Sequence, residues 1–324
     1  MKINILIILI SSVLLNSCMT TQNQIDAEDV ARNYLLESIS DSTLFWNKIH
    51  AIEFLIDLGY IEEIRSIMNI LGDNYENTPQ KRIGFWRCMS KIETNSDIKN
   101  RYIDKILNVY LDPESPDRIH AAESLAKMSV SLKNHPQPVL QSDSKNNSLK
   151  AYINWSSVYP ETSDSCIDYS VLIKTLESDN SDYKRIMAYG LKFLGKIKRE
   201  QWENIAEKAI KQPNDYPFST YLLCGALSTC PDNARKSSQA CLLRNKLKIL
   251  AKDNNPTNQY EAYISLGNFG CPDDLIFIRE EFLKLYSRMD SMQTNNSTKD
   301  VLSSISFALL KIAEKNKEDE FFNL

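Results

Sequence analysis

Two copies of a His-x-x-Glu pattern carry the side chains best suited to chemistry in this chain of 324 residues. They are His50 with Glu53 and His120 with Glu123. On a helix, residues three apart share a face, so each copy presents an imidazole beside a carboxylate. Trp46 precedes the first copy by about one helical turn, and an aromatic ring followed by a polar row can stack on a sugar or peptide and hydrogen-bond to it. We take these five residues as candidate ligand-binding residues.

The same side chains also suit two other roles, a His–Glu hydrogen bond that steadies each helix and the ligation of a metal. If neighbouring helical units stack about 10 Å apart, the two motifs lie two units and about 20 Å apart, too far to share an ion. We therefore expect no metal site and no cofactor. The third histidine, His135, has no partner nearby in the sequence and is expected in solvent.

Three short segments resemble parts of catalytic motifs, but the motifs are incomplete in this sequence. Residues 190–197 resemble a phosphate-binding loop, but Ile197 stands where magnesium binding needs Ser or Thr. Residues 124–127 and 178–180 match two elements of β-lactamases, while the third, Lys-Thr-Gly on a strand, is missing. Nothing assembles a nucleophile, a base and an oxyanion donor, so we expect a protein that is not an enzyme.

Helices must position the candidate residues, because apolar side chains recur every three or four residues from Ile25 onward. Asn134–Asn147, with two prolines, is predicted to be a longer loop. The pattern predicts an all-α protein with helices over residues 26–38, 43–58, 61–71, 79–92, 97–110, 116–132, 149–158, 169–176, 183–197, 201–210, 217–229, 234–251, 258–268, 274–289 and 299–315.

These helices pair into a repeat of about 36 residues, the length typical of two-helix units that bury their apolar stripes on their neighbours. We predict an α-solenoid of about seven to eight such repeats. The first apolar residue of each second helix recurs at Ile49, Ile83, Ile119, Ile186, Tyr221, Tyr260 and Val301, with a degenerate unit near Tyr152.

The clearest unit is 112–126, where an Asp/Pro turn precedes Arg118, the pair Ala121 and Ala122, and Leu125. It resembles the short bacterial HEAT repeat, and segments 179–195 and 256–273 repeat the pattern. The resemblance covers about residues 40–315. It implies a right-handed, HEAT/armadillo-like superhelix whose extended concave surface binds a protein partner.

Glycine is scarce, with 8 residues in the chain, or about 2.5% against a usual ~7%. Phosphate loops, nucleophile elbows and hairpins need glycine, so the scarcity disfavours most α/β and all-β folds. The net charge of −4 gives no reason to expect nucleic acid. We expect four glycines at helix ends and four inside second helices that pack closely, respectively Gly59, Gly72, Gly195 and Gly270, and Gly84, Gly190, Gly225 and Gly267.

The N-terminus has the form of a secretory signal, with Lys2 followed by an apolar run over residues 3–15 that is too short to span a bilayer. Residues 15–18, Leu-Asn-Ser-Cys, resemble the lipobox of bacterial lipoproteins of the Bacteroidetes type. The resemblance implies a signal peptide at 1–17, a lipidated Cys18 with a tether at 18–24, and a HEAT-like domain at 25–324. It also implies a lipid-anchored protein of the bacterial cell envelope, at the outer membrane and facing the periplasm. An ordinary secretory signal cut nearby, or an uncleaved anchor, is the alternative.

Six further cysteines leave disulfide pairing open, especially in the C-terminal third. Cys88 and Cys224 lie on predicted helices, where a buried thiol acts as a small apolar group. Trp86, Trp155 and Trp202 are expected in the core.

Two functions follow from these observations. The first is an envelope lipoprotein that acts as a non-catalytic, protein-binding scaffold. The alternative is a glycan-binding or glycan-processing protein that uses the face bearing Trp46, His50, Glu53, His120 and Glu123. A closed ring of helices around a deep acidic pocket would favour the glycan role, and an open superhelix without a pocket near the histidines would favour the scaffold.

Overall fold

The computed structural model describes residues 27–40, 45–133, 135, 147–160, 167–213, 216–288 and 296–322. These residues are helical with short connections, and no strand occurs among them, which confirms the all-α class. Cys18, Cys166, the proposed signal peptide and tether, and nearly all of the predicted loop 134–147 lie outside the described residues. Residues 27–40 form the first helix. The other α-helices are α2 (Phe45–Asp57), α3 (Ile61–Glu76), α4 (Pro79–Ile92), α5 (Ser96–Leu111), α6 (Arg118–Lys127), α7 (Asn147–Ser156), α8 (Tyr169–Leu176), α9 (Ser181–Gly190), α10 (Arg199–Lys211), α11 (Phe218–Ser228), α12 (Ser238–Leu250), α13 (Pro256–Phe269), α14 (Asp274–Tyr286) and α15 (Asn296–Phe322).

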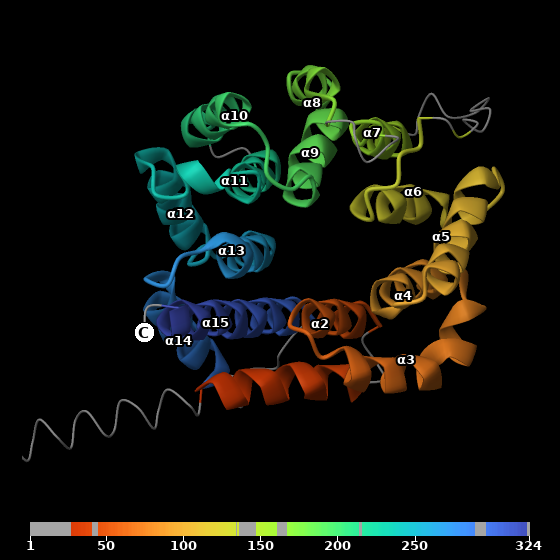
Figure 1. The fold of residues 1–324 in the computed structure, drawn as a ribbon, viewed down its shortest axis with the longest axis horizontal. Helices are drawn as coiled ribbons and strands as arrows, with labels where there is room; N and C mark the ends of the chain where they lie inside the picture. The colour runs from red at the N-terminus through yellow and green to blue at the C-terminus, as the bar shows by residue number, and fades with distance from the viewer. Residues whose placement is uncertain are drawn as a thin grey trace, which may run out of the picture.

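The helices form two layers around an open centre (Figure 1). The inner layer consists of α2, α4, α6, α7, α9, α11, α13 and α15, each packed against the next. The outer layer consists of α3, α5, α8, α10, α12 and α14. One face of each inner helix is thereby turned toward a common centre, which is where side chains from distant parts of the sequence meet.

The two ends of the array pack together. The rings of Phe54 on α2 and Phe307 on α15 stack with centroids 4.7 Å apart, and Lys311 Nζ donates a hydrogen bond to the carbonyl of Asp57 at 3.0 Å. The predicted superhelix would keep its ends apart, whereas here α15 lies against α2 and closes a ring (Figure 1). The contact buries apolar side chains from both ends of the chain, with Phe54 6% and Phe307 1% exposed, and this burial favours the closed arrangement over separated ends.

Asparagine side chains start several helices of the ring. Asn180 accepts hydrogen bonds from the backbone N–H groups of the first turn of α9, and Asn255 does the same for α13, which begins with Pro256. In the unit with the clearest repeat pattern, Asp117 precedes α6 but makes no such cap. Its carboxylate instead accepts two hydrogen bonds of 2.8 Å from Arg82 on α4, so it fixes one inner helix to the next.

Three glycines let inner helices of the C-terminal half approach closely, as expected. A Cβ on Gly225 of α11 would lie 2.3 Å from that of Leu191. A Cβ on Gly190 would lie 2.7 Å from the ring of Trp155, and one on Gly267 of α13 would lie 2.7 Å from the backbone of Ala308 on α15. No side chain fits at these positions without moving its neighbours.

Two of the expected helix-end glycines take the left-handed conformation, Gly59 with φ of 87° and Gly195 with φ of 73°. The expectation was wrong for Gly72, which lies inside α3 because that helix continues to Glu76. Gly270 does follow α13, but with an extended backbone rather than a left-handed one.

The interior divides into two apolar clusters, one centred on α2, α4 and α6 and the other on α9, α11, α13 and α15. Trp86, Trp155 and Trp202 are buried, as predicted. The cysteines in the described residues are free thiols, and burial raises the pKa of both Cys88 and Cys224 to about 12, so these two are kept protonated. Among the described helices, none is long and apolar enough to cross a membrane.

Candidate functional site

A cavity of about 450 Å³ lies at the centre of the ring. Every inner helix contributes to its wall, from Trp46 and His50 on α2 to Ser297 and Asp300 on α15. The volume lies within the range of about 300–1,000 Å³ that is usual for small-molecule sites. Closure of the ring therefore brings residues from all the inner helices to one cavity.

Four of the five candidate residues meet in this cavity: Trp46, His50, His120 and Glu123. The ring centroids of Trp46 and His120 are 5.8 Å apart, edge to face. Side chains from two units that are not neighbours in the sequence thus meet, and both histidines line one cavity.

Glu53 does not line the cavity but lies behind its wall. Its carboxylate accepts a hydrogen bond of 2.7 Å from Arg87 Nε, while His50 Nδ1 lies 3.3 Å from Asp300 on α15. Glu123 pairs with Lys127, one turn along α6, at 2.8 Å. The predicted His–Glu pairs within each helix are thus not formed, because each of the two glutamates has a full positive charge within reach.

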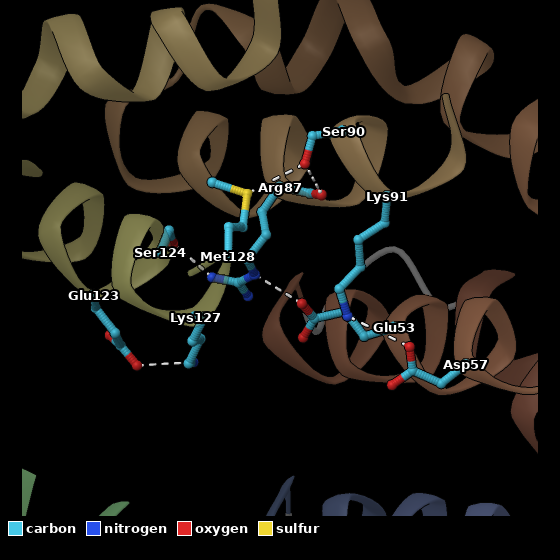
Figure 2. Close-up of polar contacts among 9 residues, drawn as sticks. All are labelled: Glu53, Asp57, Arg87, Ser90, Lys91, Glu123, Ser124, Lys127 and Met128. Carbon is cyan, nitrogen blue, oxygen red and sulfur yellow. Dashed lines mark hydrogen bonds and ion pairs between the residues drawn. The ribbon is translucent and has the colours of Figure 1, made fainter. Parts of the chain in front are cut away.

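Arg87 joins three inner helices beside the cavity (Figure 2). From α4 it donates to Glu53 on α2 and, through Nη1, to Ser124 on α6 at 2.7 Å. Its third guanidinium nitrogen has no hydrogen bond to the side chains drawn in Figure 2. Since Arg87 is one of the lining residues, this nitrogen is a donor available to a ligand.

The electrostatics of this cluster keep its groups ionised. Burial alone would raise the pKa of Glu53, but the charges of Arg87 and Lys91 lower it well below its usual value. Burial would likewise raise the pKa of Glu123, yet Lys127 and Arg87 lower it. A carboxylate held ionised accepts hydrogen bonds and does not donate a proton, so Glu123 suits binding better than acid catalysis.

A second buried pair closes the opposite wall. Lys192 forms an ion pair with Glu261 on α13, and their side chains are only 10% and 6% exposed. The Lys192 ammonium also lies 4.1 Å from the ring centroid of Tyr189, a cation–π contact. The sequence pattern does not single out either residue. It predicts a continuous helix over residues 183–197, whereas Lys192 lies in a short 3₁₀ turn after α9.

Four tyrosines complete the wall: Tyr152 on α7, Tyr189 on α9, Tyr221 on α11 and Tyr260 on α13. Burial raises the pKa of all four, so the phenols stay neutral. Within the described part of the chain, no hydrogen-bond partner is found for their hydroxyls. The signal for three of them was present in the sequence, since Tyr152, Tyr221 and Tyr260 occupy one repeat position, but that position was assigned to the core.

No group of three or more His, Cys, Asp or Glu side chains able to hold a metal ion occurs among the described residues. Comparison with known proteins finds no matching family model, no matching curated sequence and no matching solved structure. The geometry offers neutral hydroxyls, aromatic rings and charges that are already paired. Such a wall can hold a polar ligand in a fixed orientation.

Proposed function

We propose that the central cavity binds a neutral ligand rich in hydroxyl groups, namely a saccharide. The observation that carries this proposal is the set of four neutral tyrosines that line the cavity and whose hydroxyls have no hydrogen-bond partner among the described residues. A phenol both donates and accepts a hydrogen bond, as a sugar hydroxyl requires. Aromatic rings also offer flat apolar faces to the C–H groups of a sugar ring.

The pairing of charges supports a neutral ligand. Arg87, Lys127 and Arg185 line the cavity, and so do three acids, Glu123, Glu261 and Asp300. Arg87 already pairs with Glu53 and Lys127 with Glu123, while the acid Glu261 already pairs with Lys192. A charged ligand would have to displace one of these partners and leave a buried charge uncompensated, which is costly.

The closed ring and the cavity near both histidines favour the glycan hypothesis over an open scaffold. The cavity is not the acidic pocket expected of a glycan-processing enzyme, because its acids and bases balance. We therefore place binding ahead of catalysis. We also infer that the units are HEAT-like repeats whose successive rotation closes the array instead of extending it.

The test is a calorimetric titration of the purified full-length chain with neutral oligosaccharides of the gluco, manno, xylo and N-acetylglucosamine series. Tyr221→Phe and Tyr260→Phe should each weaken binding about 5- to 10-fold, since a lost hydrogen bond contributes about 1 kcal/mol. Tyr286→Phe is the matched control, because Tyr286 lies on the outer helix α14 and is 39% exposed. If none of the sugars binds, or if the cavity variants bind as well as the control, the proposal fails.

We further propose that the protein is a lipoprotein anchored in the bacterial cell envelope through Cys18, at the outer membrane and facing the periplasm. The support is the apolar run over residues 3–15 with the Leu-Asn-Ser-Cys sequence that follows it. Acyl chains on one cysteine hold a protein at a bilayer when more than one is present. Cys18→Ala should abolish palmitate labelling and move the protein out of the membrane fraction; unchanged fractionation would contradict the anchor.

A protein partner is the second candidate, and exposed apolar side chains on the outer layer favour it. Leu242 and Ile249 on α12 are 48% and 72% exposed, and Ile276 and Leu283 on α14 are 66% and 43% exposed. Lys252, two residues after the end of α12, forms an ion pair with Glu281 on α14 at 3.4 Å. Crosslinking in intact cells, with Ile249→Asp as the comparison, should recover a partner that the variant loses.

A further inference from the structure

Trp46 differs from the other tryptophans of the described chain. It is 43% exposed, whereas Trp86, Trp155 and Trp202 are buried. It also lines the central cavity. Leaving a large aromatic ring half in water sacrifices the stabilisation that its burial would give, so its position calls for an explanation.

The ring of Trp46 is held in place although it is exposed. Phe45 contacts it edge to face with centroids 4.8 Å apart, and His120 from α6 does so at 5.8 Å. These contacts come from two different helices. A bound ligand would therefore meet a ring whose orientation is already set, which reduces the entropy lost on binding.

The exposed fractions of the lining side chains distinguish the mouth of the cavity from its deeper part. Tyr189 and Tyr260 are only partly accessible. Tyr189 lies against the buried Lys192, and Tyr260 precedes the buried Glu261 in the sequence. Trp46 is far more open to solvent, so it lies at the mouth and the tyrosines lie deeper. A sugar residue hydrogen-bonded to the tyrosine hydroxyls would have its next residue at the level of Trp46.

We propose that Trp46 forms an outer subsite, so that the ligand is an oligosaccharide with one residue among the tyrosines and the next stacked on the indole. This inference rests on the proposed function and specifies its substrate class. The indole face carries partial negative charge and attracts the C–H groups of a sugar ring, an interaction that does not depend on the pattern of hydroxyls. The inner residue then sets the identity of the sugar, and the outer subsite sets the preference for chain length.

The experiment measures affinity against chain length. The full-length chain is titrated with one to four residues of the series that binds most tightly among the neutral sugars above. In the wild type, affinity should rise about 3- to 10-fold from one to two residues, the range expected for an aromatic contact. Trp46→Ala and Trp46→Leu should reduce that rise to less than about 2-fold.

Tyr260→Phe serves as the internal comparison, because it should weaken every chain length by the same factor and preserve the rise. Trp46→Leu keeps apolar bulk without an aromatic face, so a loss seen in both Trp46 variants is due to stacking and not to a gap. A rise that survives in both variants overturns the outer subsite, and so does a wild type that gains nothing from a second residue. In both cases binding of the single sugar still stands, whereas an absence of binding at every length rejects the proposed function itself.

Discussion

The two halves of the ring are joined by different physical means. In the N-terminal half, α2, α4 and α6 are connected by buried charge, with Arg87 between Glu53 and Ser124 and with Arg82 bound to Asp117. In the C-terminal half, α9, α11, α13 and α15 approach through Gly225 and Gly267, where no side chain fits. The first arrangement fixes which polar atoms face the cavity, and the second fixes how close the helices come.

This difference shows how a closed ring of helices can enclose a polar cavity. Side chains that line the cavity must offer polar groups to a ligand. Any charge among them that is buried must also have a partner of opposite charge. The N-terminal half meets that demand with ion pairs. The C-terminal half meets it with one buried ion pair, Lys192 with Glu261, and chiefly with tyrosines, whose neutral hydroxyls cost less to bury than charges do. The two kinds of wall face each other across one cavity.

The largest expected effect comes from breaking the charged connection. Arg87→Met leaves Glu53 buried without its partner, and we expect a loss of about 3–5 kcal/mol in the free energy of unfolding. Urea denaturation measures it. The double variant Glu53→Gln/Arg87→Met should recover most of the loss, because no uncompensated charge remains. Arg199→Met is the control, since Arg199 and Glu203 form an exposed pair that contributes less than about 1 kcal/mol; equal losses in the two single variants would contradict a special role for burial.

The next effect tests the close approach in the other half. Gly225→Ala places a methyl group 2.3 Å from the Cβ of Leu191 and 2.9 Å from the carbonyl oxygen of Ala188. We expect a loss of about 1–3 kcal/mol from overpacking. Gly84→Ala is the matched control in the N-terminal half, because the atom nearest to a Cβ at Gly84 lies 3.5 Å away. Here we expect a stabilisation of about 0.5–1 kcal/mol from the higher helix propensity of alanine. Denaturation midpoints that fall equally for both would refute the contrast.

Acid should loosen the charged half first. The pKa of Glu53 and that of Glu123 are lowered in the folded protein, so their stabilisation is complete above the unfolded value of about 4.3 and is lost as pH falls below it. The pKa of Asp57 is raised by burial and acts in the opposite sense, which makes the net effect smaller than for Arg87→Met. Hydrogen exchange at pH 7 and at about pH 4, corrected for intrinsic rates, should show lost protection in α2, α4 and α6 before α11 and α13. Simultaneous loss in both halves would argue against this order.

The sequence was sufficient for the all-helical class, the buried tryptophans and the close-packed Gly190, Gly225 and Gly267, because each depends on local periodicity or on small size. It was not sufficient for closure of the ring, since periodicity shows which face of a helix is buried but not the angle between successive repeats. Glu53, Arg87 and Glu123 each stand four residues after the first apolar residue of their unit. That shared position was a signal for their contact, yet a charged residue at a single repeat position is more often in solvent. The closure of the ring, which the sequence pattern does not show, brings these three residues together.

The seam where the two halves meet gives the smallest expected effect. Asn47 Nδ2 donates a hydrogen bond of 2.7 Å to Asp300, and His50 lies 3.3 Å from the same carboxylate. These groups are partly open to water, with His50 and Asp300 side chains 30% and 28% exposed, so Asp300→Asn should lower the free energy of unfolding by no more than about 1 kcal/mol. Phe307→Ala, which removes the apolar stacking at the same seam, should cost about 3–5 kcal/mol. If Asp300→Asn alone opened the ring, seen as a larger radius in small-angle scattering, then polar contacts and not apolar packing would hold its ends together.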